Sequence, residues 1–514
     1  MSLITSGIAL VGSLFTSAAI TNAVIGIGLS IGLSYAAQAL QKRGQAPITG
    51  NDNSAALNSP AVKYNERQAI PSKRIPYGYV QQGGALFFES VKPPYLYQGI
   101  LLSAKQITAI QKMWIGTNEI FFDSLVPNTI LTPIGVSGQP NYPGRLQICF
   151  RLGSATQAID PLLHNDFPNL DASFRQQGIA TAVCRYHYGG DYTEFTSLWG
   201  QVQRPNPLFL VQGVSVPDPR RAGHILNWNP NDPDSVAEAE ASWSFSNNSS
   251  LVQAHYLTQR FGGRIDPGRM DWDKVAAAAE YDDDIIGCLD GTFQRRYTID
   301  GLITLNQSPV DVISGMISAN RGFVLESAGR VWVSSSKPRY PVVAIHDGIL
   351  TGNVDYRAAK PKRDLVNRIK NRFIAPDREY QQVDGPVLSR TDLQSKDGEI
   401  LDATLNLPFT LDDRRAQRLQ KAFLESGRLG AQLVVRCDVS LLAESSEELV
   451  GSSIKFDSIL FAQANGVYFV TDWGFADGFT SIDVTLTQYD PSIELNWVPN
   501  VDEQPFVLAP LDVS

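Results

Sequence analysis

The chain has 514 residues, with 43 Lys and Arg against 52 Asp and Glu, so its formal net charge is −9. Charged residues make up 18% of the chain, below the usual ~25%, and they form no long basic cluster, which argues against a protein that reads nucleic-acid sequence. The four cysteines lie far apart and no metal or nucleotide motif of known spacing occurs, so we predict no catalytic residue, no cofactor and no metal.

The chain opens with an apolar segment that we predict to be helical. No charged side chain occurs between Ser2 and Gln41, and ~20 apolar residues suffice to span a bilayer. Gly28, Gly32 and Ala36 place small residues on one helical face, where a second helix can approach closely. A membrane anchor and a helix buried between copies of the same chain both fit this pattern.

Short strands follow a polar stretch. Residues 75–80 and 85–89 are strand-like and flank Gly83-Gly84, a pattern that predicts a β-hairpin. Further strands are expected at 95–103, 146–152, 179–188 and 208–216. The pattern over 107–120 is ambiguous, with 114–119 typical of a strand and a turn.

Two helices and a helix–hairpin unit come next. The segment Asn248-Ser249-Ser250 can cap a helix that continues from Leu251 to Thr258, and Asp271-Trp272-Asp273 opens a second helix over 275–281. Ser308 precedes a third helix, which a hairpin over 323–333 follows.

The last part of the chain combines an amphipathic helix near Leu419 with strands. Ile482, Val484 and Leu486 alternate with polar residues, which predicts a strand with one buried face.

This order of elements closely resembles the tail-tip hub, or host-specificity, proteins of lambda-like siphophages. The phrases that carry the resemblance are Tyr77-Gly78-Tyr79-Val80 before Gly83-Gly84, Gly213 to Val216 before Asp218-Pro219-Arg220, Gln307-Ser308-Pro309 with its helix and hairpin, Asp364 to Ile369, Leu401 to Thr410, and Thr480 to Ile493.

The resemblance implies an α+β, mainly β, multidomain fold with two tail-tube-like β-barrel domains. The expected parts are an apolar N-terminal helical segment (1–44), a linker or arm (45–72), a first β-domain with an inserted loop region (73–222), intervening α+β domains (223–345), a last tube-like β-domain (346–499) and a docking tail (500–514).

The resemblance also implies a structural virion protein at the distal end of a phage tail, made in the host cytoplasm. Three copies with two β-domains each give six around the axis of a six-fold tail tube. The expected partners are the tail tube or a distal tail protein, the tape-measure protein, and DNA that passes through without sequence-specific binding. In this setting the apolar segment has a third reading, in which the tail stores it and releases it toward the host membrane.

The lambda-like proteins continue into fibre and receptor-binding domains, whereas this sequence ends at Ser514. We therefore expect a truncated form whose tail binds a separate central fibre or receptor-binding protein.

Two other classes of function remain open. A tail-associated cell-wall hydrolase would have its site in the loop region 125–175. A glycan-binding tail protein would use Tyr95, Tyr97 and Trp114 as stacking platforms.

Several charged groups invite a functional interpretation. Asp282-Asp283-Asp284 fits a Ca²⁺ site poorly, because alternate ligands and a distal Glu are missing, so we interpret it as a solvated helix end. The pairs Arg220-Arg221 and Arg295-Arg296 either meet acidic neighbours in a ring or, more simply, face solvent.

Overall fold

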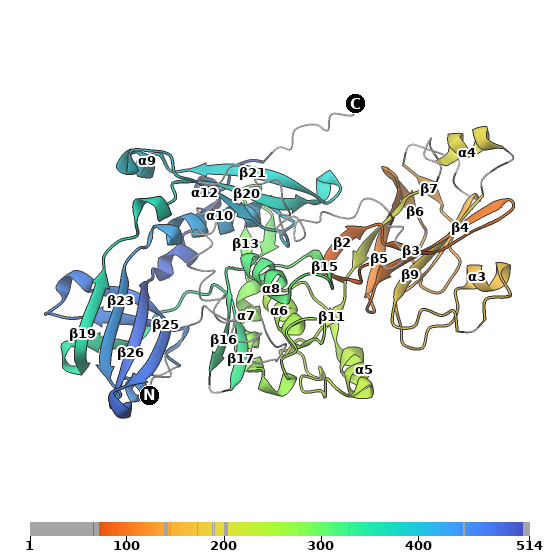
Figure 1. Ribbon diagram of the computed structural model, residues 1–514. Coiled ribbons are helices and arrows are strands. Elements are labelled where there is room, and N and C mark those ends of the chain that lie inside the picture. The colour runs from red at the N-terminus through yellow and green to blue at the C-terminus, as the bar shows by residue number, and fades with distance from the viewer. Residues whose placement is uncertain are drawn as a thin grey trace.

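The computed structural model describes residue 65 and residues 71–506, apart from residues 138–141, 143, 172, 188, 190, 200–203, 328 and 446–447. Within these ranges the chain is a multidomain α+β, mainly β protein, which confirms the predicted fold class. Figure 1 shows a β module on the right, a helical region in the centre and further sheets at the left and top.

Some predicted segments lie outside the described residues. They are the apolar segment with Gly28, Gly32 and Ala36, nearly all of the arm, and residues 507–514 of the tail. Within the described part, no helix is both long and apolar enough to cross a membrane.

The first β module consists of two sheets that share one core. The five-stranded sheet contains, in spatial order, β2 (Tyr79–Gln82), β10 (Pro207–Gln212), β5 (Ala109–Ile115), β6 (Asn118–Phe121) and β7 (Gly135–Val136). The four-stranded sheet contains β3 (Ala85–Lys92), β4 (Tyr95–Ser103), β9 (Ala180–His187) and β8 (Leu146–Arg151). Phe209 and Met113 from one sheet and Ile100 and Phe150 from the other belong to the same buried cluster.

The predicted hairpin around Gly83 and Gly84 is wrong. β2 pairs with β10 and β3 pairs with β4, so the two glycines carry the chain from one sheet to the other. Gly84 has a φ of +88°, and a Cβ there would lie 2.4 Å from the carbonyl oxygen of Leu101. A tight turn and such a crossing both require glycine, so the local pattern does not distinguish them. The preceding β1 (Arg74–Tyr77) pairs with β15 (Gly301–Thr304) in a third sheet.

The central region contains helices and small hairpins. Its elements are β11 (Ser215–Val216) paired with β12 (Ser244–Phe245), α5 (Pro233–Ser242), α6 (Ser249–Thr258), α7 (Trp272–Asp282), β13 (Ile285–Gly287) paired with β14 (Phe293–Arg295), α8 (Pro309–Ser318), and β16 (Phe323–Ser327) paired with β17 (Arg330–Ser334). Both helices occur where they are predicted. The caps are Asn248, from the predicted capping segment 248–250, and Asp271, and each side chain accepts a backbone N–H at 3.2 Å, from Leu251 and Lys274 respectively. Ser308 stands before α8 as predicted, but its side chain makes no capping hydrogen bond in the described structure.

The last region contains two sheets and the amphipathic helix α10 (Asp413–Arg428). The six-stranded sheet has the order β18 (Pro341–His346), β24 (Ser453–Asp457), β25 (Gly466–Ala476), β26 (Ser481–Gln488), β23 (Gln432–Asp438) and β19 (Leu350–Arg357), and the three-stranded sheet has the order β21 (Gln381–Ser389), β20 (Arg368–Ala375) and β22 (Asp402–Asn406). Leu419 and Phe423 of α10 pack on the three-stranded sheet. The six-stranded sheet is curved, since its two edge strands supply Ile345 and Val354 to one core.

The remaining helices are short. They are α3 (Pro161–Asp166), α4 (Tyr192–Trp199), α9 (Thr391–Asp397), α11 (Leu441–Glu444), α12 (Pro499–Asp502), and the 3-10 helices η2 (Pro267–Arg269), η3 (Asp347–Ile349), η4 (Lys362–Asp364), η5 (Pro376–Arg378), η6 (Ala462–Ala464), η7 (Asp477–Phe479) and η8 (Pro491–Glu494).

A fully buried arginine fixes the long connection between β8 and β9, which includes α3. The guanidinium of Arg151 donates to the carbonyl of Ala158 at 2.5 Å and to the side-chain oxygen of Gln176 at 2.9 Å. It lies 3.6 Å from the buried carboxyl of Asp160, which caps α3. Burial raises the pKa of Asp160 to about 6, although the charge of Arg151 opposes this rise. Arg151 therefore binds both ends of the connection to the four-stranded sheet, in which it is the last residue of β8.

We expect Arg151→Met to lower the free energy of unfolding of the first β module by about 3 kcal/mol at pH 7, because it leaves the buried Asp160 carboxyl without its cation. Chemical denaturation measures this change, and limited proteolysis should cut the β8–β9 connection sooner than in the wild type. The matched control is Arg175→Met, since the Arg175 side chain is exposed in the same connection. Equal losses for the two variants would contradict the role of Arg151.

Candidate functional site

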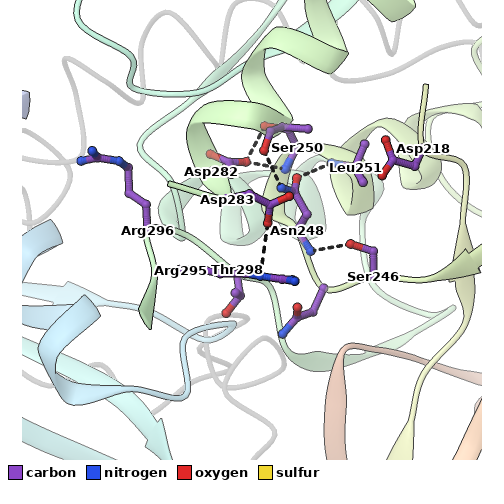
Figure 2. A network of polar contacts seen from close by, with 12 residues as sticks. Asp218, Ser246, Asn248, Ser250, Leu251, Asp282, Asp283, Arg295, Arg296 and Thr298 are labelled. Atoms are coloured by element: carbon purple, nitrogen blue, oxygen red, sulfur yellow. Dashed lines mark hydrogen bonds and ion pairs between the residues drawn. The ribbon is translucent and has the colours of Figure 1, made fainter. Parts of the chain in front are cut away.

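The acidic run at the end of α7 places its three carboxylates in three different surroundings, and Figure 2 shows those of Asp282 and Asp283. Asp282 is fully buried, Asp283 is partly buried and Asp284 is half exposed. The interpretation of this run as a solvated helix end is therefore wrong for Asp282. The last turn of α7 ends against the first turn of α6, so it faces protein rather than water.

Asp282 accepts hydrogen bonds from two segments that are distant in sequence. Its Oδ2 accepts from the backbone N–H of Ser250 at 2.7 Å and from the Ser250 hydroxyl at 2.6 Å, and its Oδ1 accepts from the Ser335 hydroxyl at 2.5 Å. Burial raises the pKa of Asp282 to about 7, while the serine hydrogen bonds oppose this rise. One carboxyl thus joins the end of α7, the start of α6 and the segment after β17.

Asn248 completes this joint from the α6 side. Its Nδ2 donates to the carbonyl of Ala279 in α7 at 2.8 Å, while its Oδ1 caps the N–H of Leu251. Its own backbone N–H donates to the hydroxyl of Ser246 at 3.1 Å. Because Asp282 accepts the neighbouring N–H of Ser250, two of the first N–H groups of α6 bind side chains.

Asp283 binds two arginines that come from different elements. It accepts a hydrogen bond from Arg220 at 2.9 Å and lies 3.5 Å from the Nε of Arg295 on β14. Arg220 also makes two hydrogen bonds to Asp218, of 2.8 and 2.9 Å, which raise the pKa of its guanidinium. The interpretation of these arginines as plain solvent-facing residues is therefore wrong for Arg220, whose acidic neighbours lie in its own chain.

Helix α10 holds the β13–β14 hairpin from another side. Arg415 and Arg418 both donate to the carbonyl oxygen of Arg296, at 3.2 and 3.0 Å, and Arg414 pairs with Asp290 at 2.7 Å. Burial, together with the positive charge of Arg415, lowers the pKa of Arg418 to about 10. The hairpin is thus bound to α7 through acidic residues and to α10 through basic ones.

This arrangement suits a structural joint rather than a reaction centre. The oxygens of Asp282 are occupied by serine and backbone donors, and Asp283 is occupied by guanidinium groups. Nowhere in the described ranges do three His, Cys, Asp or Glu side chains lie where they could hold a metal ion. A buried carboxyl with hydrogen bonds to both oxygens, as in Asp282, fixes the relative positions of the elements that it joins.

The three aromatic residues suggested as a glycan platform do not form one. Tyr97 is fully buried, and its hydroxyl donates to Asp166 at 2.6 Å. The guanidinium of Arg185 lies 4.6 Å from the centre of the Tyr95 ring, which it covers. Trp114 belongs to the other sheet of the module.

The described part of the predicted docking tail packs on its own chain. The ring of Phe506 lies 5.6 Å from that of Phe373, and Asp502 pairs with Lys421 of α10 at 2.8 Å. The backbone of Gln504 bonds to the side chain of Gln417 in both directions.

No protein-family model matches the sequence, and no curated protein matches it either. Among solved structures, a chain of the virion of native gene transfer agent (GTA) particle is 13% identical, covers 94% of this chain and 98% of its own length, and has a TM-score of 0.55. This likeness shows a shared fold over almost the whole chain.

Two further structures match weakly. The tail protein from Neisseria meningitidis MC58 is 10% identical and covers 84% of this chain and 97% of its own, with a TM-score of 0.30. The 43 kDa tail protein of prophage MuSo2 from Shewanella oneidensis is 7% identical and covers 82% and 95%, with a TM-score of 0.28. TM-scores of this size do not show a shared fold.

We expect Asp282→Asn to change how stability depends on pH. An ordinary Asp has a pKa near ~3.9, so the raised pKa means that the folded wild type holds a proton which the unfolded chain has lost, and stability falls as pH rises from about 4 to about 7. The variant cannot ionise at this position. Its melting temperature should therefore rise relative to that of the wild type as the pH increases from 4 to 7. Melting curves at pH 4, 5.5, 7 and 8 measure the gain. Asp273→Asn, on the same helix outside the network, controls for net charge, and parallel wild-type and Asp282→Asn profiles would refute the assignment.

Proposed function

We propose that this chain is a structural protein of a phage-like tail and not an enzyme. The observation that carries the proposal is the fold likeness to a chain of the gene transfer agent virion, which extends over 94% of this chain at a TM-score of 0.55. A likeness that includes the outer modules as well as the central region supports a common architecture rather than one shared domain.

Within the tail, we propose the role of tail-tip or baseplate hub. The sequence phrases that resemble tail-tip hub proteins fall on elements with the expected order. The α8 helix leads into the β16–β17 hairpin with Trp332 on its second strand, and α10 leads into β23 and the long β25–β26 pair. These elements support the assignment because both the local motifs and their order along the chain agree with the resemblance.

We propose that the hub is a homotrimer in which each chain contributes two β modules to the tube. The first module has two sheets around one core, and the last has a curved six-stranded sheet. Three chains would then present six modules to a six-fold tube. Such a hub would cap the tube, contact the tail tube or distal tail protein, hold the tape-measure protein, and open so that DNA passes without being read. A separate central fibre or receptor-binding protein would bind beyond it.

The apolar N-terminal segment has a place in this proposal. Three copies of the row formed by Gly28, Gly32 and Ala36 would meet at the trimer axis, where small residues permit close helix packing. Release of this segment at ejection would bring uncharged, apolar chain to the host membrane. The two roles are compatible, because the first belongs to the stored state and the second to the released state.

The trimer is tested by the mass of the purified protein in solution. Light scattering coupled to size-exclusion chromatography should give three times the chain mass of 56.3 kDa, and negative-stain images should show rings in end view. A mass that stays at one chain at every concentration, with no label at the distal end of virions, would remove the basis of the proposal.

The membrane role is tested with dye-filled liposomes. The released full-length protein should cause leakage, whereas a variant without residues 1–43 should not, because the uncharged segment lies within these residues. The two proteins are compared in the same oligomeric state and at the same concentration. Equal leakage, or none from either, would count against membrane contact through this segment while leaving the hub assignment in place.

A further inference from the structure

We propose that a basic connector on one copy of this chain binds an acidic helix on the next copy. The basic connector is residues 357–363, which end β19 and lead into η4. The acidic helix is α5 together with its capping residue Asp232. The inference rests on the proposed assembly of several copies and names the surfaces through which they meet.

The basic connector exposes its positive charges. Its sequence is Arg-Ala-Ala-Lys-Pro-Lys-Arg, with four cations and no acid. Arg357 is exposed, and the side chains of Lys362 and Arg363 are 55% and 84% exposed. Lys362 lies 3.2 Å from Glu399 and Arg363 lies 3.7 Å from Asp364, so the charge is reduced but not cancelled.

The connector is held in place against the body of the protein. The Nζ of Lys360 donates to the carbonyl of Gly427 at 3.3 Å, and burial lowers the pKa of this amine. A Cβ at Gly430 would lie 2.7 Å from the backbone nitrogen of Lys360, so the two chain segments touch. Pro361 restricts the backbone between the exposed cations. The charges are therefore presented at defined positions rather than on a freely moving loop.

The acidic helix is the counterpart of the connector. Asp232, Asp234 and Glu238 are exposed, and none of the three has an ion pair in the described structure. No lysine or arginine occurs between residues 222 and 259, and the next cation along the chain, Arg260, donates to the side chain of Asn231 at 3.4 Å. Asp232 caps the helix and Asp234 lies in its first turn, where the helix dipole favours carboxylates.

The two surfaces cannot meet within one chain. Figure 1 places β19, at the start of the connector, at the far left, whereas α5 lies at the lower right of the central region. Contact between such surfaces on neighbouring copies is head-to-tail, and it forms a closed ring when the rotation between copies permits. Among the described residues, the ion pair of α5 joins its Glu240 to Lys105 at 2.5 Å, and this pair does not involve Asp232, Asp234 or Glu238.

A second copy fits the connector better than a nucleic acid does. The connector spans seven residues in a chain of net charge −9, so its positive surface is short and lies beside the acidic Glu399 and Asp364. The same chain carries an acidic surface of matching size. Exposed ion pairs each contribute little to affinity, but opposed patches orient the approaching copies and speed association by about 10- to 1000-fold at low salt.

The test reverses the charges in the full-length protein. One triple variant carries Arg357→Glu, Lys362→Glu and Arg363→Glu, and a second carries Asp232→Lys, Asp234→Lys and Glu238→Lys. Each should slow association from diluted protein about tenfold or more at low ionic strength, as followed by light scattering. A chain with all six changes should regain a rate near that of the wild type, since the pairing is restored with the signs exchanged.

A control separates the local effect from net charge. Arg175→Glu, Arg330→Glu and Lys337→Glu reverse three exposed cations elsewhere in the chain and should leave the association rate within a factor of about two to three. Normal association of both triple variants would overturn this inference alone. So would loss of duplex DNA binding by the connector variant while its association is unchanged. A wild type that never associates would instead contradict the proposed function, and this inference with it.

Discussion

The Asp282 carboxyl binds Ser250 and Ser335, which lie 32 and 53 positions away along the chain. Burying a carboxyl is costly, and leaving it without partners costs more still. The helices α6 and α7 and the segment after β17 therefore separate only if this group is exposed to water or loses its hydrogen bonds. Through Asp283 and the β13–β14 hairpin, the same constraint extends to α10, which packs on the three-stranded sheet. The central region is thus a fixed frame between the two β modules.

Within this frame, many of the charged residues bind other groups of the same chain. Many of the arginines near the centre bind carboxylates or carbonyl groups inside the same chain, as Arg220 and Arg415 do. Such groups position elements and contribute little to surface recognition. The basic connector and the acidic helix differ, because their exposed charges are only partly compensated within the chain. In the proposed assembly, the internal geometry would stay constant while these two surfaces would determine how copies meet.

Local signals in the sequence predicted part of this arrangement. The starts of α6 and α7 are recognisable from 248–250 and 271–273, because a capping side chain acts within three residues of its own position. The strands at β4, β8 and β9 follow from apolar patterns that need no distant partner. The burial of Asp282 does not follow from the sequence, since its donors arrive from remote segments and Asp283 and Asp284 look identical to it. The crossing between sheets at Gly83-Gly84 could not be predicted for a related reason. Tertiary packing decides which strands pair, and the local sequence does not show it.

The pairing of β1 with β15 has a bearing on how the chain is made. Arg74 aligns with Thr304, so the first strand emerges from the ribosome about 230 residues before its partner. At ~5–20 residues per second, this delay lasts roughly 10–50 seconds. Throughout this interval Ile75 and Tyr77, which are fully buried in the finished protein, have no β15 to pack beside. Apolar side chains that wait for a distant partner strand make such an intermediate prone to aggregation.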